Sequence, residues 1–596
     1  MKKYLLPILA FLSQIITAQN DFLIQNIDGR KITTLNGEWK IIIDPYENGY
    51  YNYRYEPDPN GFFRNTKPKD KTERVEYDFD KSESLTVPGD WNSQKEKLFL
   101  YEGTVWYKKT FDYNKKDNRR TFVHFGAVNY QCHVYLNGEK IGEHTGGFTP
   151  FDFEITDKIK NVENFIIVKV DNKRLREGVP TLNTDWWNYG GITRGVSIID
   201  VPVTFIQDYF LQLKKNSNST IAGWIKLNGA VQNTEVIVEI PELNIYKNFK
   251  CDDKGFVEFS FNASPALWSP GNPKLYEVKI ISEQDMINDK IGFRNISVEG
   301  TDILLNGKKI FLKGISIHEE APARNGRANS VEDAQTLLNW AKELGCNFVR
   351  LAHYPHNENM IREAEKMGIL VWSEIPVYWT ILWDNKTTFE NASKQLCEMI
   401  GRDKNRAPII LWSVANETPR SEPRLEFLKK LISKAKELDP TRLITAATEI
   451  HYTNSNTIML NDPLGEFLDV LGCNEYIGWY DGLPQKADTI NWLSAFNKPL
   501  IMSEFGGSAR YGLHGDSLTI WTEEYQENLY KHQTKMLKRI SFLAGLSPWI
   551  LMDFRSPRRP LAGVQDFFNR KGLYSNTGEK KKAFYILQQF YNSIND

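Results

Sequence analysis

The chain has 596 residues, enough for roughly three or four domains of about 150 residues each. Hydrophobic residues make up 41% of the chain and charged residues 25%, so several cores can form and general disorder is excluded. Lys and Arg total 74 and Asp and Glu total 75, a net charge of -1. That balance argues against nucleic acid or an anionic membrane surface as the partner.

The cysteines predict neither a disulfide framework nor a zinc site, because none has CxxC or Cys/His spacing. We therefore expect no metal and no other cofactor. The five cysteines are Cys132, Cys251, Cys346, Cys397 and Cys473.

The N-terminus is typical of an export signal. Lys2 and Lys3 precede an apolar stretch at 4–16, and small residues follow at 17–18, which predicts a signal peptide over 1–18. The apolar stretch is short for a membrane span, and no Cys marks a lipid attachment point, so we expect no membrane anchor. The expected location is the periplasm, with secretion as the alternative.

Short β-rich runs separated by turn residues fill 19–201 and predict a jelly-roll-like β-sandwich. One run, 132–136, ends in Asn137 and Gly138, a strong signal for a hairpin turn. A second β region at 202–299 has the length of one immunoglobulin-like β-sandwich, about 100 residues.

An irregular aromatic stretch at 46–63 contains Gly and Pro and predicts an insertion loop. Its tyrosines either line an extended substrate cleft or pack as a loop or subunit contact, and the general behaviour of such aromatics favours packing. The sequence therefore allows a homo-oligomer as well as a monomer. These tyrosines are Tyr50, Tyr51, Tyr53 and Tyr55.

After residue 300, short apolar runs alternate with amphipathic helices, such as 331–344 with Ser330 as N-cap and Gly345 as its stop. Eight strands separated by helices predict a (β/α)8 TIM barrel over 300–596. The whole chain is then a multidomain protein of class β plus α/β. The expected barrel strands are 310–315, 347–352, 369–373, 409–415, 443–447, 468–474, 500–503 and 545–552.

Polar residues that directly follow barrel strands are the candidates for catalysis, because active sites lie at the C-terminal ends of the strands. Glu417 follows the fourth strand and Glu504 the seventh. Paired carboxylates suit the cleavage of an acetal, where one protonates the leaving oxygen and the other attacks the anomeric carbon. The alternative is that each is an ordinary strand-end glutamate.

These motifs together resemble glycoside hydrolase family 2, which includes β-galactosidases, β-glucuronidases and β-mannosidases. The segment 347–355 (NFVRLAHYP) is similar to a family signature, Asn416-Glu417 to the acid/base motif, and 503–506 (SEFG) to the nucleophile motif. The likeness extends to 146–151 in the first sandwich and covers nearly the whole chain after the signal peptide.

The resemblance implies that Glu417 is the general acid/base and Glu504 the nucleophile, with net retention through a glycosyl-enzyme intermediate. It further implies that Asn416 binds the sugar 2-hydroxyl. Arg350 would stabilise the nucleophile, with a structural salt bridge as the alternative. Tyr476 would hydrogen-bond near the nucleophile, with a core tyrosine as the alternative.

Asn569 and Lys571 resemble the Asn-x-Lys element of β-glucuronidases, whose amide and ammonium bind the C6 carboxylate of the sugar. The alternative is a solvated basic turn, since 580–582 are three further lysines. Four more residues complete the expected substrate-binding set by their family positions. They are Asp185, His318, Tyr480 and Trp549.

The chain departs from the glucuronidase pattern at two positions. Gln565 stands where an Arg is expected, with Arg558 and Arg559 as nearby substitutes, and Glu475 replaces a basic residue, which predicts a different aglycone side. The segment after Glu504 lacks the His of β-galactosidases, and no acidic set resembles their magnesium site.

We therefore expect an exported, retaining exo-β-glucuronidase that removes terminal β-D-glucuronic acid from a uronic-acid-containing glycan, in polysaccharide breakdown. The alternatives are a β-galactosidase or another β-glycosidase of the same family, and, less favoured, a non-catalytic carbohydrate-binding protein. Both glutamates argue against the last, because a binding protein needs neither.

Overall fold

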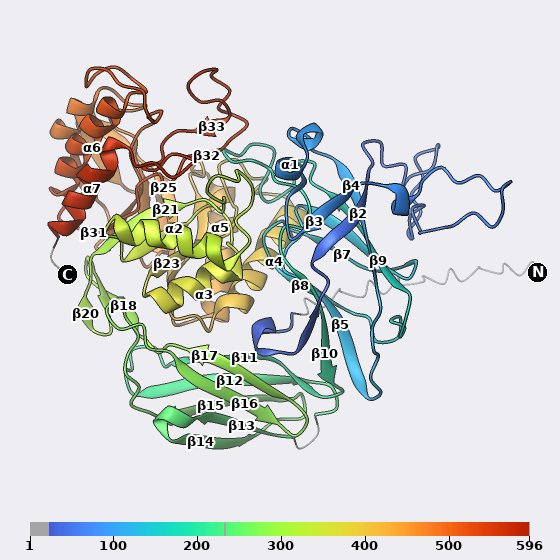
Figure 1. Ribbon diagram of the computed structural model, residues 1–596. Helices are drawn as coiled ribbons and strands as arrows, with labels where there is room; N and C mark the ends of the chain where they lie inside the picture. The colour runs from blue at the N-terminus through green and yellow to red at the C-terminus, as the bar shows by residue number, and fades with distance from the viewer. Residues whose placement is uncertain (1–22, 232–233, 595–596) are drawn as a thin grey trace, which may run out of the picture.

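The computed structural model describes residues 23–231 and 234–594, so the predicted signal peptide lies outside the described residues. Three regions are visible in Figure 1: a blue N-terminal sandwich on the right, a green sandwich at the bottom, and a yellow-to-red barrel at the upper left. Within the described residues, no helix combines the length and the apolar character needed to cross a bilayer.

The N-terminal region is a sandwich of a six-stranded and a four-stranded sheet, as expected for a jelly-roll-like fold. The larger sheet, in spatial order, is β3 (Ser84–Val87), β2 (Gly37–Ile43), β4 (Thr104–Phe111), β9 (Asn164–Asp171), β6 (Gln131–Leu136) and β7 (Glu139–Thr145). The smaller is β1 (Ile32–Thr34), β10 (Val196–Pro202), β5 (Arg119–Phe125) and β8 (Phe151–Glu154). Short helices are η1 (Ile27–Gly29), η2 (Phe79–Lys81), α1 (Trp91–Gln94) and η3 (Glu96–Leu98).

The predicted hairpin is confirmed between β6 and β7. Asn137 has φ 53° and Gly138 has φ 91°, both in the left-handed region. Positive φ at both central residues gives the two-residue turn whose twist matches that of paired strands, which is why Asn-Gly occupies it.

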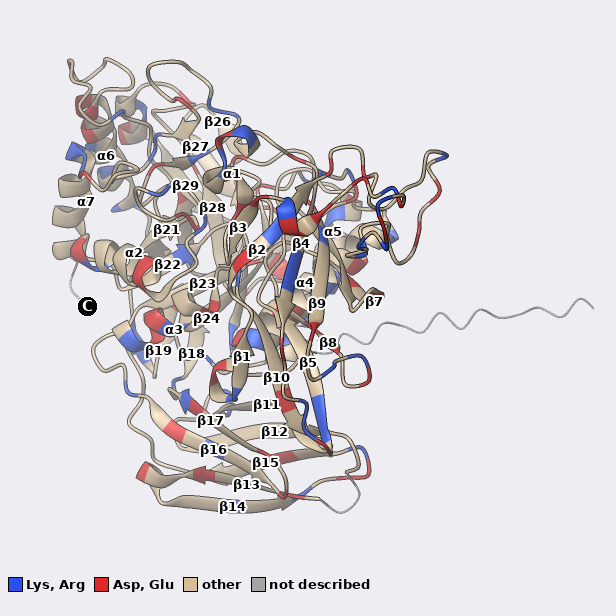
Figure 2. Ribbon diagram, turned by 45° about the vertical axis from the view of Figure 1, so that its right-hand side comes forward, with Lys and Arg blue, Asp and Glu red and all other residues tan. Residues whose placement is uncertain are grey.

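The long connection between β2 and η2, which contains the predicted insertion loop, projects from this sandwich (Figure 1) and carries charges of both signs (Figure 2). Tyr51 stacks on Tyr55 with ring centres 4.1 Å apart, and Tyr53 is 89% exposed. Tyr50 packs against His133 of β6 at 5.0 Å. Tyr50, Tyr51 and Tyr55 therefore pack on one another or on the N-terminal sandwich, whereas Tyr53 lies in solvent.

The second region packs two antiparallel sheets about one apolar core, as expected for an immunoglobulin-like sandwich. Buried and exposed residues alternate strictly along β17, as in a strand with one face on the core. The strands are β11 (Phe205–Leu213), β12 (Thr220–Asn228) and β15 (Phe256–Asn262), then β14 (Ile245–Lys250), β13 (Glu235–Ile240), β16 (Tyr276–Ser282) and β17 (Met286–Ile291), with η4 (Pro241–Leu243). A small sheet follows, made of β18 (Ile296–Glu299), β19 (Asp302–Leu305) and β20 (Lys308–Lys309).

The third region is a closed barrel of eight parallel strands, which confirms the TIM-barrel prediction. In order, the strands are β21 (Leu312–Ile317), β22 (Phe348–Leu351), β23 (Leu370–Glu374), β24 (Ile409–Asn416), β25 (Leu443–Glu449), β28 (Leu471–Asn474), β30 (Leu500–Glu504) and β31 (Leu543–Leu546). Every residue of β24 is buried, because the barrel interior covers one face and the outer helices the other.

The eighth strand ends earlier than the predicted 545–552. Pro548 has no N–H to donate to a neighbouring strand. The Trp549 N–H instead donates to the Phe505 carbonyl at 2.9 Å, beyond the end of β30. Trp549 therefore lies in the loop at the barrel mouth.

The outer layer is only partly helical. Ser330 caps α2 in a capping box with Asp333, and Gly345 follows the helix with φ 94°, as predicted. The α-helices are α2 (Val331–Glu343), α3 (Glu358–Met367), α4 (Lys386–Asp403), α5 (Glu422–Leu438), α6 (Glu523–Leu537) and α7 (Lys582–Asn592).

After β25 and β28, a three-stranded sheet and 3-10 helices occupy the places where α-helices were expected. They are β26 (Tyr452–Asn454), β27 (Thr457–Leu460), β29 (Asn491–Ser494), η5 (Pro463–Glu466) and η6 (Pro484–Thr489). A final hairpin over the barrel mouth pairs β32 (Phe554–Arg555) with β33 (Phe568–Asn569).

Candidate active site

A cavity of about 220 Å³ opens at the C-terminal ends of the barrel strands. Both predicted catalytic glutamates line it. The full set is Asp185, His353, Tyr378, Trp379, Glu417, Glu449, Tyr476, Tyr480, Glu504, Trp549, Arg559 and Lys571. Of the predicted substrate-binding residues, four lie outside this lining: His318, Arg350, Asn416 and Asn569.

Glu504 ends β30, and two donors hold its carboxylate. Arg350 Nη1 donates to Oε1 at 2.8 Å, and the Tyr476 hydroxyl donates to Oε2 at 2.7 Å. Both donors stabilise negative charge on the carboxylate and fix its orientation towards the cavity. Tyr476 is therefore more than a packed core residue.

Arg350, on β22, is fully buried and joins several groups of the site. Besides Glu504, it donates to both oxygens of Glu374 at 3.1 and 3.0 Å, to Asn416 Oδ1 at 2.7 Å and to the Ser503 carbonyl at 3.1 Å. The salt bridge and the contact with the predicted nucleophile are thus both present, so the two roles considered for Arg350 do not exclude each other.

Glu374, at the end of β23, was missed by the sequence analysis. It also accepts from Trp372 Nε1 at 2.7 Å and lies 2.8 Å from His353 Nδ1. Burial raises the pKa of Glu374, but Arg350 and His353 outweigh burial and bring its pKa down to about 2. Its position directly after an apolar run was the same signal that identified Glu417 and Glu504.

Glu417 directly follows β24 and has a different environment from Glu504. Trp379 Nε1 donates to Oε2 at 2.8 Å, and Asn474 Nδ2 donates to Oε1 at 3.0 Å. Burial, and next the charge of Glu504, raise the pKa of Glu417 to about 7 despite these two donors. The carboxyl of Glu417 can therefore carry a proton near neutral pH beside a charged carboxylate.

The side-chain amides of Asn416 and Asn474, together with Arg350, connect the two glutamates through hydrogen bonds. Asn416 Oδ1 accepts from Arg350 and also from Asn474 Nδ2 at 3.1 Å. Asn416 Nδ2 is buried and has no hydrogen-bond partner among the described residues. That nitrogen is therefore available to donate to a bound hydroxyl.

Lys571 supplies a positive charge deep in the cavity. Its side chain is buried, with the residue 2% exposed, so it is not part of a solvated basic turn. Nζ donates to the Tyr480 hydroxyl at 2.8 Å and lies over the rings of Tyr476, Trp479 and Tyr480 at 5.1, 5.9 and 4.7 Å. No carboxylate of a described residue lies within ion-pair distance of this ammonium, so its charge favours a bound anion.

Asp185 reaches the cavity from the N-terminal sandwich. Its carboxylate accepts from Ser556 Oγ at 2.6 Å, from Arg559 Nε at 3.0 Å and from Asn569 Nδ2 at 3.1 Å, and it forms an ion pair with Arg559. The Asn569 amide nitrogen therefore helps to hold Asp185, and Asn569 itself does not line the cavity. The cavity thus needs two domains.

Trp549 lines the cavity and stacks on His353, with ring centres 4.7 Å apart and planes 21° apart. His318 packs beneath it, 5.2 Å from the Trp549 ring and 4.1 Å from Phe554, with Nδ1 3.1 Å from the Tyr354 hydroxyl. Burial lowers the pKa of His318 well below its ordinary value. This neutral ring therefore supports Trp549 and lies outside the cavity lining.

The departures from the glucuronidase pattern have different consequences. Gln565 does not line the cavity, whereas Arg559 does. Glu475 is buried in the barrel wall, where Oε2 accepts from the Ile477 N–H at 2.7 Å and burial raises its pKa to about 8. Glu475 does not line the cavity, and a different aglycone side stays a prediction.

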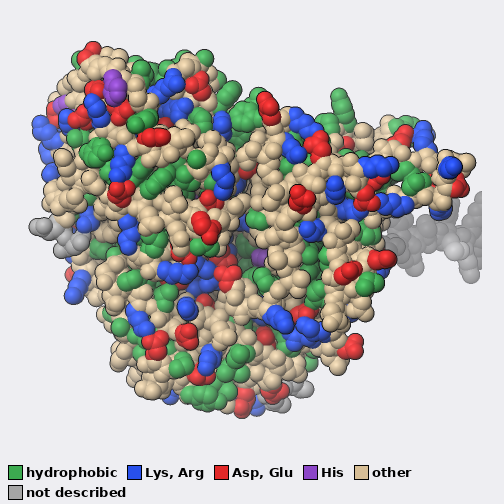
Figure 3. Space-filling model, in the orientation of Figure 1, with side chains coloured by type: hydrophobic (Ala, Val, Ile, Leu, Met, Phe, Trp, Pro, Cys, Tyr) green, Lys and Arg blue, Asp and Glu red, His purple; other side chains and the backbone are tan. Residues whose placement is uncertain are grey.

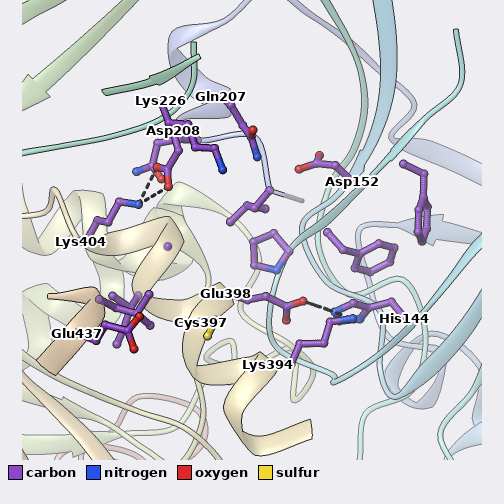
Figure 4. Close-up of a pocket in the computed structure, with 18 of the residues that line it drawn as sticks. His144, Asp152, Gln207, Asp208, Lys226, Lys394, Cys397, Glu398, Lys404 and Glu437 are labelled. Carbon is purple, nitrogen blue, oxygen red and sulfur yellow. Dashed lines mark hydrogen bonds and ion pairs between the residues drawn. The ribbon is translucent and has the colours of Figure 1, made fainter. Parts of the chain in front are cut away.

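A second cavity, of about 350 Å³, lies where the two sandwiches meet α4 (Figure 4). Two contacts between its polar groups stand out: His144 Nε2 lies 2.9 Å from Glu398, and Lys404 Nζ donates to both oxygens of Asp208 at 2.7 and 2.6 Å. On the face shown in Figure 3, acidic and basic side chains are interspersed. Within 23–231 and 234–594, no cluster of three His, Cys, Asp or Glu side chains is placed to hold a metal ion.

Comparison with protein families matches the chain to three domains of glycosyl hydrolases family 2. Residues 32–202 match its sugar binding domain, 204–294 its central domain, and 296–595 its TIM barrel domain. Together these matches cover nearly all the described residues.

Similar proteins carry the name β-glucuronidase. The chain is 26% identical to a β-glucuronidase of Paenibacillus borealis over 95% of this chain and 98% of that protein. It is 27% identical to the β-glucuronidase of Rattus norvegicus over 85% of this chain and 84% of that protein. A solved β-D-glucuronidase structure from Dictyoglomus thermophilum superposes with a TM-score of 0.79 at 26% identity, covering 96% of this chain and 98% of the other.

Proposed function

We propose that this chain is a retaining exo-β-glucuronidase that releases terminal β-D-glucuronic acid. The chain belongs to glycosyl hydrolases family 2 and is a glycoside hydrolase. The similarity to β-glucuronidases supports the sugar class. The single observation that carries the assignment to a uronic acid is the buried ammonium of Lys571, which has no carboxylate partner among the described residues.

The proposed mechanism is a double displacement. Glu504 attacks the anomeric carbon while Glu417 protonates the departing oxygen, which breaks the glycosidic bond and leaves a glycosyl ester on Glu504. Glu417, now ionised, takes a proton from water, and the resulting hydroxide displaces Glu504. The environments support this division, because Glu504 has two donors that stabilise its charge and the pKa of Glu417 is raised to about 7.

The donors around the reacting carbon have matching tasks. Asn416 Nδ2 donates to the 2-hydroxyl of the sugar, a hydrogen bond that strengthens as positive charge develops on the ring. Arg350 holds both Asn416 and Glu504, so the sugar and the nucleophile are positioned by one guanidinium.

A neutral galactoside would place a hydroxymethyl group where the proposed site binds a carboxylate. Lys571 would then stay buried without an anion, which costs affinity and rate, because a buried charged donor is left unpaired. The runner-up, a β-galactosidase, is therefore disfavoured by the same residue.

The test compares the release of 4-nitrophenol from the β-D-glucuronide, the β-D-galacturonide and the β-D-galactoside, with the first product anomer followed by proton NMR. We expect the glucuronide to be the best substrate and the β-anomer to form first. Cleavage of only the galactoside would overturn the uronic-acid assignment, and initial release of the α-anomer would overturn retention.

We also propose export to the periplasm, which the signal-like sequence at 1–18 supports, and a role in polysaccharide breakdown, which rests on the proposed exo-β-glucuronidase activity. Fractionation of the source cells, with N-terminal sequencing of the mature protein, checks this. A cytosolic protein that keeps residues 1–18 would contradict it.

A further inference from the structure

A second cation stands at the rim of the cavity and has no task in the reaction described above. Arg558 is exposed and directly precedes Arg559, which lines the cavity. Its guanidinium carbon lies 4.9 Å from the ring centre of Trp379, and Nη1 donates to Asn183 of the N-terminal sandwich. These contacts, to a loop of the barrel and to another domain, hold the guanidinium at one place on the rim.

The charges of the other arginines at the site are already used. Arg350 is paired with Glu374 and Glu504, and Arg559 with Asp185. For Arg558, no carboxylate of a described residue lies within ion-pair distance. Its guanidinium therefore resembles the ammonium of Lys571, because each presents a positive charge that the surrounding protein leaves unpaired.

The position of Arg558 is on the leaving-group side of the cavity. Trp379 is the residue whose indole N–H binds Glu417 Oε2, so the proton that reaches the departing oxygen comes from next to this indole. The aglycone must then leave past Trp379 and the guanidinium that covers its ring. Lys571, in contrast, is buried and donates to the Tyr480 hydroxyl, and neither residue contacts Trp379 or Arg558 in a hydrogen bond or ion pair.

The end of β25 presents the exposed carboxylate of Glu449, which also lines the cavity. Its negative charge contributes to the raised pKa of Glu417. An aglycone sugar therefore meets a positive group at Arg558 and a negative group at Glu449. Only one orientation suits an anionic substituent, with the anion at Arg558 and hydroxyls at Glu449.

We propose that Arg558 and Trp379 form a leaving-group subsite for a sugar that carries an anionic substituent, a carboxylate or a sulfate ester. This inference rests on the proposed β-glucuronidase function and adds that the substrate carries a second negative charge, next to the bond that is cleaved. A planar guanidinium suits both anions, because it donates two parallel hydrogen bonds to either.

The experiment measures kcat/KM for three disaccharides with β-D-glucuronic acid at the non-reducing end. Their reducing sugars are neutral, carboxylate-bearing or sulfated. The readout is the ratio of kcat/KM for each anionic disaccharide to that for the neutral one. We expect the ratio to exceed 1 in the natural protein and to fall about 2- to 5-fold in R558Q, mainly through KM, because the guanidinium is exposed to solvent.

Two further variants separate charge from structure. Arg54→Gln is the matched control, because Arg54 also lies over an aromatic ring, that of Tyr53 at 5.3 Å, in the insertion loop. R54Q should keep the natural ratio, and R558K should retain part of it. E449Q should raise the ratio, because it removes the repelling charge.

The outcomes are distinct. A ratio in R558Q equal to that in the natural protein, or a natural ratio of 1 or less, would overturn the subsite while leaving the glucuronidase proposal intact. Failure to cleave any glucuronide would remove both proposals. If the ratio in R558Q falls for only the sulfated or only the carboxylate disaccharide, the result would support the subsite and identify its anion. If it falls for both, the result would support a subsite that recognises negative charge of either kind.

Discussion

The cavity at the barrel mouth and the cavity at the domain junction differ in how their charges are used. The junction cavity is the larger, at about 350 Å³ against about 220 Å³. Several of its polar groups bind one another, as His144 with Glu398 and Lys404 with Asp208, although Lys226 on its rim is exposed and forms no ion pair with a described residue. At the barrel mouth, Lys571 has no carboxylate partner among the described residues, and the pKa of Glu417 is raised to about 7.

The comparison teaches that unpaired or perturbed charge identifies a reactive site better than volume does. Paired ions stabilise the arrangement of the domains and leave little to offer a ligand. An ammonium held among aromatic rings, and a carboxyl kept protonated beside a carboxylate, are unfavourable for the protein alone and become useful only with substrate. Substitutions at the barrel mouth should therefore lower activity with little change in stability, and substitutions in the junction cavity should lower stability with little change in activity.

The largest effect is expected at the predicted nucleophile. E504Q should lower kcat for 4-nitrophenyl β-D-glucuronide on the order of 10⁴-fold or more, because no covalent intermediate can form. An unchanged melting temperature would show that the fold survives. Activity within tenfold of the natural value would remove Glu504 from this role.

A smaller loss, which depends on the leaving group, is expected at Glu417. E417Q should lower kcat/KM by about 10²- to 10⁴-fold for a glucuronosyl disaccharide, since the departing oxygen then receives no proton. The loss for the 4-nitrophenyl substrate should be smaller, because nitrophenolate leaves without protonation. Equal losses for the two substrates would contradict the assignment of Glu417 as the acid.

Removing the buried ammonium should change selectivity. K571M keeps the length of the side chain but not its charge, and should lower kcat/KM for the glucuronide by about 10- to 100-fold, the value of one charge-assisted hydrogen bond. The value of kcat/KM for the galactoside should change little, so the preference for the glucuronide over the galactoside should decrease. A parallel loss for both substrates would mean that Lys571 serves structure and not recognition.

The pH dependence follows from the raised pKa of Glu417. The acid works only when protonated, so kcat/KM should decline about tenfold for each unit above a pH of about 7, which is the pKa of Glu417. Glu449 contributes to this rise, so E449Q should lower that pKa and move the decline to lower pH. A rate that stays constant up to pH 9 would contradict this role of Glu417.

The smallest effect on activity is expected at the junction cavity. Glu398 accepts from the Thr149 hydroxyl at 2.6 Å and lies 2.9 Å from His144 Nε2, far along the chain from both. E398Q should cost about 1–3 kcal/mol of folding free energy, seen as a lower melting temperature, with kcat/KM unchanged below that temperature. Loss of activity without loss of stability would give this cavity a functional role.

Much of the fold was predictable because the signals are local. Alternating apolar runs predicted the sandwiches, Asn137-Gly138 predicted a hairpin, and Ser330 and Gly345 bounded a helix correctly. The end of the eighth strand was wrong, since it depends on where the Trp549 N–H finds an acceptor. No local pattern contains that information.

The sequence by itself determined which two glutamates lie at the ends of β24 and β30, because strand ends and short motifs are local features of the chain. Only the tertiary structure gave the two carboxyl groups the different environments that suit an acid and a nucleophile. The pKa of Glu417 depends on burial and on the charge of Glu504. The ammonium of Lys571 is surrounded by the rings of Tyr476 and Tyr480, which are more than 90 positions away along the chain. Electrostatic energies follow distance and burial in space, and the order of residues specifies these only through the complete fold.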